Sequence, residues 1–253
     1  MSQPLALIHS GLGHGGVWKR FLDALNMDVE PVSIELPGHG DAEEWDRSRN
    51  YADQAVELAL DAMPSEPVPL IGHSFGAVVA LRIALQRPGR ASSLVLIEPV
   101  LYAAVADSYV FDKLQRDMAL FARHVDSGSL AKAAKDFHEI WGTDEPWDDV
   151  PEMVRKYMMA RIELIAASGD FLWQDSSNLL VPDGLEELDI PVTLVEGDKS
   201  HPIMTQIVDA LGRRIPGAEG IIVPGAGHMV PITHPMPVAE AVRHRLIWGF
   251  PDD

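Results

Sequence analysis

Short apolar runs alternate with longer amphipathic stretches along most of the chain. Runs of four to six apolar residues bounded by Gly, Pro or charged residues are typical of strands buried on both faces. Such runs predict strands at Leu5–His9, Val32–Leu36, Val68–Gly72, Ser93–Ile97, Pro191–Glu196 and Gly220–Val223. Helical spacing predicts helices around Val17–Leu25 and over Tyr51–Met63, Phe75–Gln86, Ile203–Arg214 and Pro237–Ile247. This alternation predicts an α/β fold with a mostly parallel sheet of about six strands, flanked by helices on both faces.

The stretch from residue 101 to residue 188 departs from this pattern, because it contains no strand-like run. It reads as helices at Val110–His124, Ser129–Trp141 and Pro151–Ala167. An insertion of this length between two sheet strands is typical of a lid or a small second domain. We therefore predict a core of residues 1–100 and 189–253 with a helical cap at 101–188. The alternative is a helical layer that only packs on the core.

The net charge of the chain indicates which kinds of molecule it is expected to bind. Among 253 residues, 20 Lys and Arg face 38 Asp and Glu, which gives a formal net charge of −18. Such a surface repels phosphate backbones and anionic bilayers, so we expect a small-molecule substrate, no nucleic acid and no membrane. The chain has no cysteine, which removes disulfides and a cysteine nucleophile. With no signal-peptide pattern at its start, a cytoplasmic location is expected.

The strongest chemical signal is the pentapeptide Gly72-His-Ser-Phe-Gly76. A G-x-S-x-G arises easily by chance, but here a predicted strand runs into it and a predicted helix leaves it. This strand–turn–helix setting is typical of a nucleophile elbow, which holds a serine hydroxyl at the carboxyl edge of a parallel sheet. The sequence therefore predicts Ser74 as a nucleophile, and an ordinary tight turn is the alternative.

A serine nucleophile needs a general base, and His228 is the candidate. It lies in Pro224-Gly-Ala-Gly-His-Met229, directly after the last predicted strand and therefore at the same sheet edge. Other histidines near that edge, His9, His14 and His201, have no acidic ligand set at useful spacing, so we expect no metal. The Gly-rich stretch that begins at Gly11 does not match the dinucleotide pattern, so we expect no cofactor.

Four motifs in this order resemble the α/β-hydrolase superfamily. They are His9-Ser-Gly11, Leu36-Pro-Gly-His-Gly40, Gly72-His-Ser-Phe-Gly76 and Gly225-Ala-Gly-His228. The resemblance covers nearly the whole chain outside the insertion. It implies a Ser–acid–His triad and an oxyanion hole formed by the backbone N–H of Phe75 and one from the first loop. The loop donor is expected to be Gly11, with Leu12 as the second candidate.

The third member of the implied triad is where the chain departs from the family. The family acid commonly follows the penultimate strand as Gly-x-x-Asp, but that place reads Gly197-Asp-Lys-Ser200. Asp198 lies two residues early. Glu98 ends the strand after the nucleophile helix, and haloalkane dehalogenases of the superfamily take their acid from that strand. We predict Glu98 as the acid, with Asp198 or no working acid as the alternatives.

The constellation predicts acyl transfer to water. The expected substrate is a small apolar carboxylic ester, or a related thioester, lactone or amide, cleaved through an acyl-enzyme on Ser74. The pocket in the insertion is expected to be lined by Trp141, Trp147, Met153, Met158 and Trp173. A cofactor-free lyase of the hydroxynitrile-lyase type and a weakly catalytic ligand receptor are the alternatives, because both would use the same scaffold.

Overall fold

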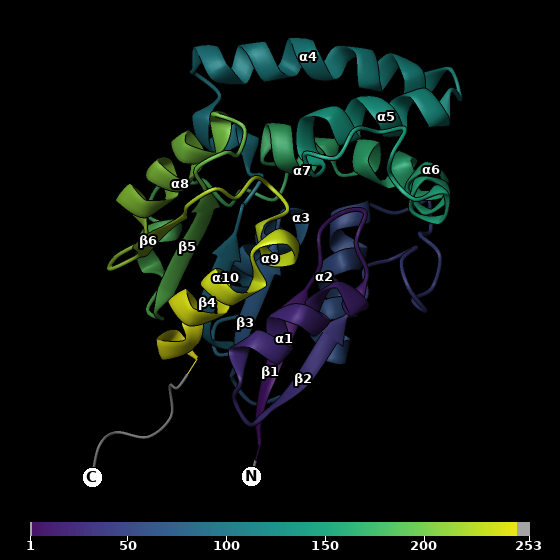
Figure 1. Ribbon diagram of the computed structural model, residues 1–253. Helices are drawn as coiled ribbons and strands as arrows, with labels where there is room; N and C mark the ends of the chain where they lie inside the picture. The colour runs from purple at the N-terminus through teal and green to yellow at the C-terminus, as the bar shows by residue number, and fades with distance from the viewer. Residues whose placement is uncertain (1, 247–253) are drawn as a thin grey trace, which may run out of the picture.

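A six-stranded parallel sheet forms the centre of the computed structural model, which describes residues 2–246 (Figure 1). The strands are β1 (Gln3–Ile8), β2 (Val29–Ile34), β3 (Val68–His73), β4 (Ala91–Ile97), β5 (Val192–Gly197) and β6 (Glu219–Val223). Their order across the sheet is β2-β1-β3-β4-β5-β6, and every neighbouring pair is parallel. The predicted α/β fold with about six strands is therefore confirmed.

The largest error in the strand prediction concerns β2, which begins at Val29 and not at Val32. This strand lies at the edge of the sheet and pairs only with β1. Glu30 and Pro31 are exposed, as an edge strand permits, since its outer N–H groups need no partner in the sheet. The apolar pattern therefore marks only the half of β2 that faces the core.

Helices cover both faces of the sheet because each inner strand buries alternate residues on opposite sides. Leu70 of β3 belongs to the core on one face, and its neighbour Ile71 belongs to the core on the other. The first face is covered by α2 (Tyr51–Ala62), α3 (Phe75–Gln86) and α8 (Ile203–Arg214). The second face is covered by α1 (Lys19–Leu25) and α10 (Pro235–Val242). The bounds predicted for α3 and α8 are those observed.

The C-terminal helix differs from its prediction, which ran from Pro237 to Ile247. It is divided into α9 (Val230–Thr233), α10 and a short 3₁₀ turn at Arg243–Arg245. Proline is tolerated in the first turn of a helix, where its missing N–H would have no intrahelical acceptor. The start at Pro235 follows from this rule, and the predicted end at Ile247 lies outside the described residues.

The inserted stretch is helical and lies over the carboxyl ends of the strands (Figure 1). Its longer helices are α4 (Tyr109–Asp126), α5 (Leu130–Trp141), α6 (Glu152–Ala167) and α7 (Gly169–Gln174), with short 3₁₀ turns at Tyr102–Val105 and Leu185–Glu187. Helix α7 was not predicted, because its six residues are too few to show a helical period. The insertion thus covers the edge of the sheet at which Ser74 lies.

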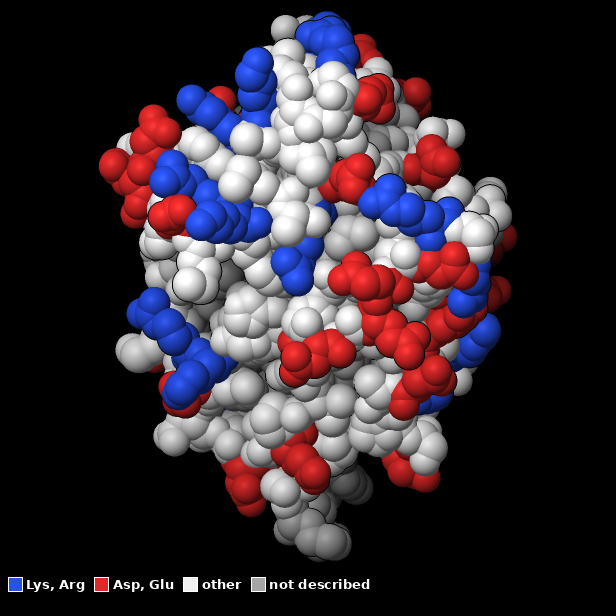
Figure 2. Space-filling model, turned by 90° about the vertical axis from the view of Figure 1, so that its right-hand side faces the viewer, with Lys and Arg blue, Asp and Glu red and all other residues white. Residues whose placement is uncertain are grey.

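The surface carries both signs of charge. Figure 2 shows a face on which acidic side chains form a broad area, while Lys and Arg lie mainly towards its upper half. Within residues 2–246, no helix combines the length and the apolar character that a membrane span requires.

Candidate active site

The turn between β3 and α3 places Ser74 in an unusual backbone conformation. Its φ of 57° and ψ of −120° lie outside the regions that L-residues commonly adopt. The turn is also crowded: a Cβ on Gly72 would lie 2.3 Å from the Gly76 carbonyl oxygen, and one on Gly76 would lie 2.4 Å from that of His9. Both positions must therefore be glycine, which explains the G-x-S-x-G pattern. The packed turn holds the strained serine at the N-terminus of α3.

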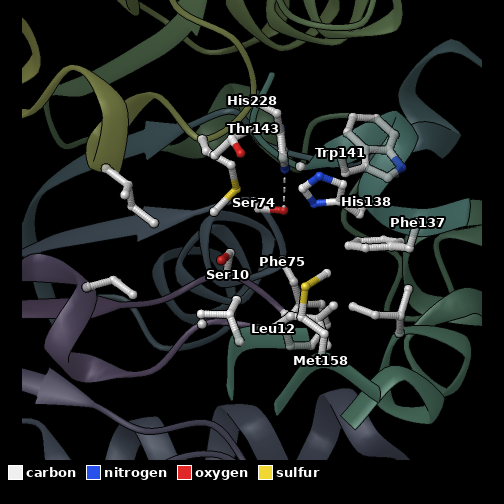
Figure 3. Close-up of a pocket in the computed structure, with 18 of the residues that line it drawn as sticks. Ser10, Leu12, Ser74, Phe75, Phe137, His138, Trp141, Thr143, Met158 and His228 are labelled. Atoms are coloured by element: carbon white, nitrogen blue, oxygen red, sulfur yellow. Dashed lines mark hydrogen bonds between the residues drawn. The ribbon is translucent and has the colours of Figure 1, made fainter. Parts of the chain in front are cut away.

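His228 follows β6 and lies directly beside Ser74 (Figure 3). Its Nε2 is 2.9 Å from Ser74 Oγ, and its Nδ1 is 2.9 Å from Glu98 Oε2. A carboxylate can only accept hydrogen bonds, so the ring proton is assigned to Nδ1 and the lone pair to Nε2. In this tautomer Nε2 can accept the proton of the Ser74 hydroxyl.

Glu98 lies immediately beyond the end of β4 and is fully buried. Its φ of 52° is unusual for a residue with a side chain, so the backbone turns sharply at this position. Oε1 accepts hydrogen bonds from the Gly197 N–H and the Ser200 hydroxyl, both at 2.7 Å, while Oε2 accepts from His228. These donors compensate the burial of a charge in the core. Ser200, which stands at the family's usual acid position, donates a hydrogen bond to the acid from β4.

Asp198, the alternative acid, is exposed to solvent. Its Oδ1 accepts a hydrogen bond of 2.6 Å from the Gly225 N–H. Asp198 therefore braces the loop that leads to His228, and its contact is with the backbone of that loop. The structure brings Glu98 to the imidazole.

His228 also contacts two aromatic side chains that the sequence did not reveal as its partners, His73 and Trp141. His73, the residue before the nucleophile, donates a 2.9 Å hydrogen bond from Nε2 to the His228 carbonyl oxygen. Burial, with a smaller contribution from His228, lowers the pKa of His73 to about 3, so its ring is neutral at neutral pH. Trp141 of α5 packs against the imidazole with ring centroids 4.8 Å apart. The available signal was the position of His73 within G-x-S-x-G, at the end of a buried strand.

The loop after β1 carries the two candidate oxyanion donors, Gly11 and Leu12. The Ser10 carbonyl oxygen accepts from His9 Nδ1 at 2.7 Å and from the Gly13 N–H at 2.8 Å. In a trans peptide the next N–H points the opposite way, so these bonds orient the Gly11 N–H.

The Gly11 carbonyl oxygen is 2.6 Å from His39 Nε2, and this contact orients the Leu12 N–H in the same manner. Phe75 is the first residue of α3, so its N–H has no intrahelical acceptor. A Cβ on Gly11 would lie 3.8 Å from the Phe75 Cβ, which puts the loop next to the start of α3. The structure therefore brings the predicted donors to one place.

Known proteins resemble this chain over most of its length. A family model described as the alpha/beta hydrolase family matches residues 5–241. The chain belongs to the alpha/beta hydrolase family. It is 27% identical over 252 residues to Lipase LipV of Mycobacterium tuberculosis, covering 94% of this chain and 91% of the lipase. It is 26% identical over 261 residues to an esterase of the same bacterium, covering 93% and 80% of the two chains.

Solved structures share the fold of this hydrolase. Carboxylesterase CesB from Bacillus subtilis superposes with a TM-score of 0.72 at 20% identity. The superposition covers 98% of this chain and 85% of the carboxylesterase. At this identity the likeness concerns the fold.

A cavity of about 580 Å³ opens between the hydrolase core and the inserted helices, and Ser74 and His228 lie in its wall. Most of its lining is apolar, and Figure 3 shows Leu12, Phe137, Trp141 and Met158 around the serine. Met153 also lines it.

The pocket prediction is wrong for two residues, Trp147 and Trp173, which do not line the cavity. The half-buried Trp173 ring packs against the core, with its centroid 4.2 Å from that of Tyr102. The Trp147 ring packs against His138 at 5.5 Å. Trp147 lies in the turn between α5 and α6, and Trp173 lies in the short helix α7, so neither position has a helical period that would show which way its ring faces.

Proposed function

We propose that this protein is a serine hydrolase that cleaves a carboxylic ester through an acyl-enzyme on Ser74. The observation that carries the proposal is the chain of contacts from Glu98 through His228 to Ser74, with 2.9 Å at each step. These contacts join a carboxylate, an imidazole and a hydroxyl in the order that nucleophilic catalysis requires. The relatives named as a lipase and an esterase support the ester as the bond that is cleaved.

Acylation begins with proton transfer from the serine hydroxyl. His228 Nε2 takes the proton of Ser74 Oγ while that oxygen attacks the ester carbonyl carbon, and the carbonyl π electrons move onto the carbonyl oxygen. The N–H groups of Phe75 and Gly11 bind this oxyanion. The Glu98 carboxylate stabilises the imidazolium formed and keeps the ring in its productive orientation.

Collapse of the tetrahedral intermediate expels the alcohol, which takes the proton from His228. A water molecule then enters, and His228 removes its proton as the oxygen attacks the acyl carbon. The second intermediate releases the carboxylic acid, and Ser74 Oγ regains a proton. Each turnover consumes one ester and one water, and it yields one acid and one alcohol.

The cavity wall favours a neutral, apolar substrate. Two of its polar side chains are already bonded to backbone: the Tyr157 hydroxyl donates to the Gly13 carbonyl oxygen and His138 Nε2 donates to that of Glu145, both at 2.7 Å. The net charge of −18 further disfavours anionic substrates. Hydrocarbon in the acyl or alcohol part would be buried against the apolar side chains.

Hydrolysis of p-nitrophenyl esters tests this proposal. We expect a burst of p-nitrophenol that matches the enzyme concentration, followed by slower turnover, with neutral acyl chains preferred over charged chains of equal length. Ser74→Ala should abolish the burst and lower kcat by about 10⁴-fold or more, since removal of a nucleophile leaves only residual catalysis.

Ser127→Ala, in the turn after α4, is the matched control and should retain wild-type rates. A Ser74→Ala protein with wild-type turnover would overturn the mechanism. Fluorophosphonate labelling without ester turnover would instead favour a ligand receptor, and cleavage of a cyanohydrin without an acyl-enzyme would favour a lyase.

A further inference from the structure

We infer that one face of α6 positions the oxyanion loop, through Tyr157 and Arg161. The inference rests on the proposed function, because it concerns the hole that would bind the oxyanion formed at Ser74. Tyr157, Arg161 and Ile165 are spaced four residues apart and therefore lie on one face of the helix. Each of them reaches the loop after β1 or the segment that supports it. We name these three residues the α6 clamp.

The first contact is direct. The Tyr157 hydroxyl donates a 2.7 Å hydrogen bond to the carbonyl oxygen of Gly13, two residues after Gly11. Burial raises the pKa of Tyr157, although the nearby Arg161 opposes this effect, so the phenol remains a donor at neutral pH. The bond crosses from the insertion to the core and fixes the far end of the loop.

The second contact acts through His39. Arg161 Nε donates a 2.9 Å hydrogen bond to the carbonyl oxygen of Gly38, the residue before His39. His39 Nε2 in turn lies 2.6 Å from the Gly11 carbonyl oxygen. Burial lowers the pKa of His39 to about 4, so the ring is neutral at neutral pH and has one N–H. Its Nδ1 lies 3.0 Å from the Pro37 carbonyl oxygen, and we assign the N–H to Nε2 because the contact with Gly11 is shorter. Arg161 thereby anchors the segment whose histidine orients the Gly11–Leu12 peptide.

The two polar residues of the clamp also bind each other. The Arg161 guanidinium lies 3.9 Å from the centroid of the Tyr157 ring, within the range of a cation–π interaction. One turn further along α6, Ile165 packs against the loop so closely that a Cβ on Gly11 would lie 2.7 Å from its Cδ1. The clamp thus restrains the carbonyl groups of Gly11 and Gly13, and with them the loop that carries the Gly11 and Leu12 N–H groups.

This arrangement makes Tyr157 and Arg161 positioning residues for transition-state stabilisation. An oxyanion donor acts only if it points at the place where charge develops, and small displacements of such groups have large effects on rate. Loss of the clamp should therefore lower kcat more than it changes KM.

Tyr157→Phe is the sharpest test, because it removes one hydroxyl and keeps the ring that stacks on Arg161. We expect kcat to fall roughly tenfold with KM within about twofold. Affinity for a trifluoromethyl ketone, which forms an oxyanion adduct with the serine, should fall by a similar factor as kcat/KM. Hydrogen exchange of the backbone amides from Gly11 to Gly13 should accelerate, and this readout requires no turnover.

Arg47→Met is the matched control, because Arg47 binds Glu163 on the exposed side of α6 at 2.7 Å and does not touch the clamp. It should leave kcat, inhibitor affinity and loop exchange unchanged. Arg161→Met should repeat the Tyr157→Phe phenotype, and the double variant should lose less than the product of the two single effects.

Wild-type values of kcat, inhibitor affinity and loop exchange in Tyr157→Phe would overturn the inference, as would equal losses in the Arg47→Met control. If the wild-type protein fails to hydrolyse esters through Ser74, the proposed function fails. The exchange experiment still decides whether α6 orders the loop. If Ser74→Ala abolishes turnover while Tyr157→Phe changes nothing, only the clamp is refuted.

Discussion

Strands β4 and β5 pair in the sheet and end at the same edge, and a carboxylate residue follows each strand directly. Glu98, after β4, is fully buried and accepts hydrogen bonds from Gly197, Ser200 and His228. Asp198, after β5, is exposed and accepts from the backbone of Gly225. Glu98 and Asp198 thus share a position at the end of a strand. They differ because Glu98 is buried and has a positive φ, so its carboxylate points inward to the histidine.

Glu98→Gln should have the largest effect on activity. The substitution keeps the shape of the side chain but removes the charge that would stabilise the protonated His228, and its amide favours the wrong imidazole tautomer. We expect kcat to fall by about 10³- to 10⁴-fold, as for the corresponding change in a serine protease. Steady-state kinetics with a neutral ester measure the effect, and a loss below about tenfold would contradict Glu98 as the acid.

A second experiment moves the carboxylate from the end of β4 to the loop after β5. In Glu98→Gln, an added Ser200→Asp substitution places a carboxylate at the family's usual position, whose side chain already contacts Glu98 at 2.7 Å. We expect kcat to recover roughly tenfold over Glu98→Gln alone, since part of the electrostatic stabilisation returns. Ser200→Ala in the same background should give no recovery, and equal rates for the two double variants would show that a carboxylate after β5 cannot serve His228.

Glu196, a buried carboxyl group within β5, should make the stability of the fold depend on pH. Burial raises the pKa of Glu196 above its ordinary value of 4.5, while the Thr205 hydroxyl at 2.7 Å opposes the shift. The folded chain then binds this proton more tightly than the unfolded chain. The resulting stabilisation is present below pH 4.5 and is lost as the pH rises through the folded pKa. Relative to Glu196→Gln, the wild-type protein should therefore lose unfolding free energy over this pH range.

Urea unfolding at a series of pH values measures this difference. Glu186→Gln is the control, because the bond to Arg214 lowers the pKa of Glu186 to about 2. The difference in unfolding free energy between this variant and the wild type should therefore stay constant above pH 5. The prediction would be refuted if the difference in unfolding free energy between Glu196→Gln and the wild type were also independent of pH.

The smallest expected effect is that of Asp198→Asn. The amide retains an oxygen that can accept from the Gly225 N–H, so kcat should stay within about twofold of wild type, as for most exposed substitutions. Side-by-side kinetics of Asp198→Asn and Glu98→Gln rank the two candidates directly. A larger loss in Asp198→Asn would reverse the comparison.

Much of the fold could be predicted because buried parallel strands and amphipathic helices leave strong periodic signals. The prediction placed α3 and α8 at their observed bounds. It missed the first half of β2, since an edge strand is half-exposed and tolerates Pro31. It also missed α7, which is too short to show a period.

The sequence predicts those parts of the candidate site at which the backbone conformation requires particular residues. Ser74 requires glycines at fixed distances along the chain, so the sequence marks it. The contacts of His73 with His228 and of Tyr157 with Gly13 join residues 155 and 144 positions apart, and no local pattern reports them. Trp147 and Trp173 show the converse error, because an aromatic residue type does not by itself reveal whether the ring faces the cavity or packs elsewhere.

Detection of the acyl-enzyme by mass spectrometry tests whether Ser74 is the nucleophile. The protein is mixed with an activated ester, quenched in acid within the burst phase, digested and analysed by mass spectrometry. We predict that the peptide containing Ser74 gains the mass of the acyl group, at close to one acyl group per chain, and that Ser74→Ala gains none. Ester turnover with no acyl mass on Ser74, or with the acyl group on another residue, would contradict the proposed mechanism.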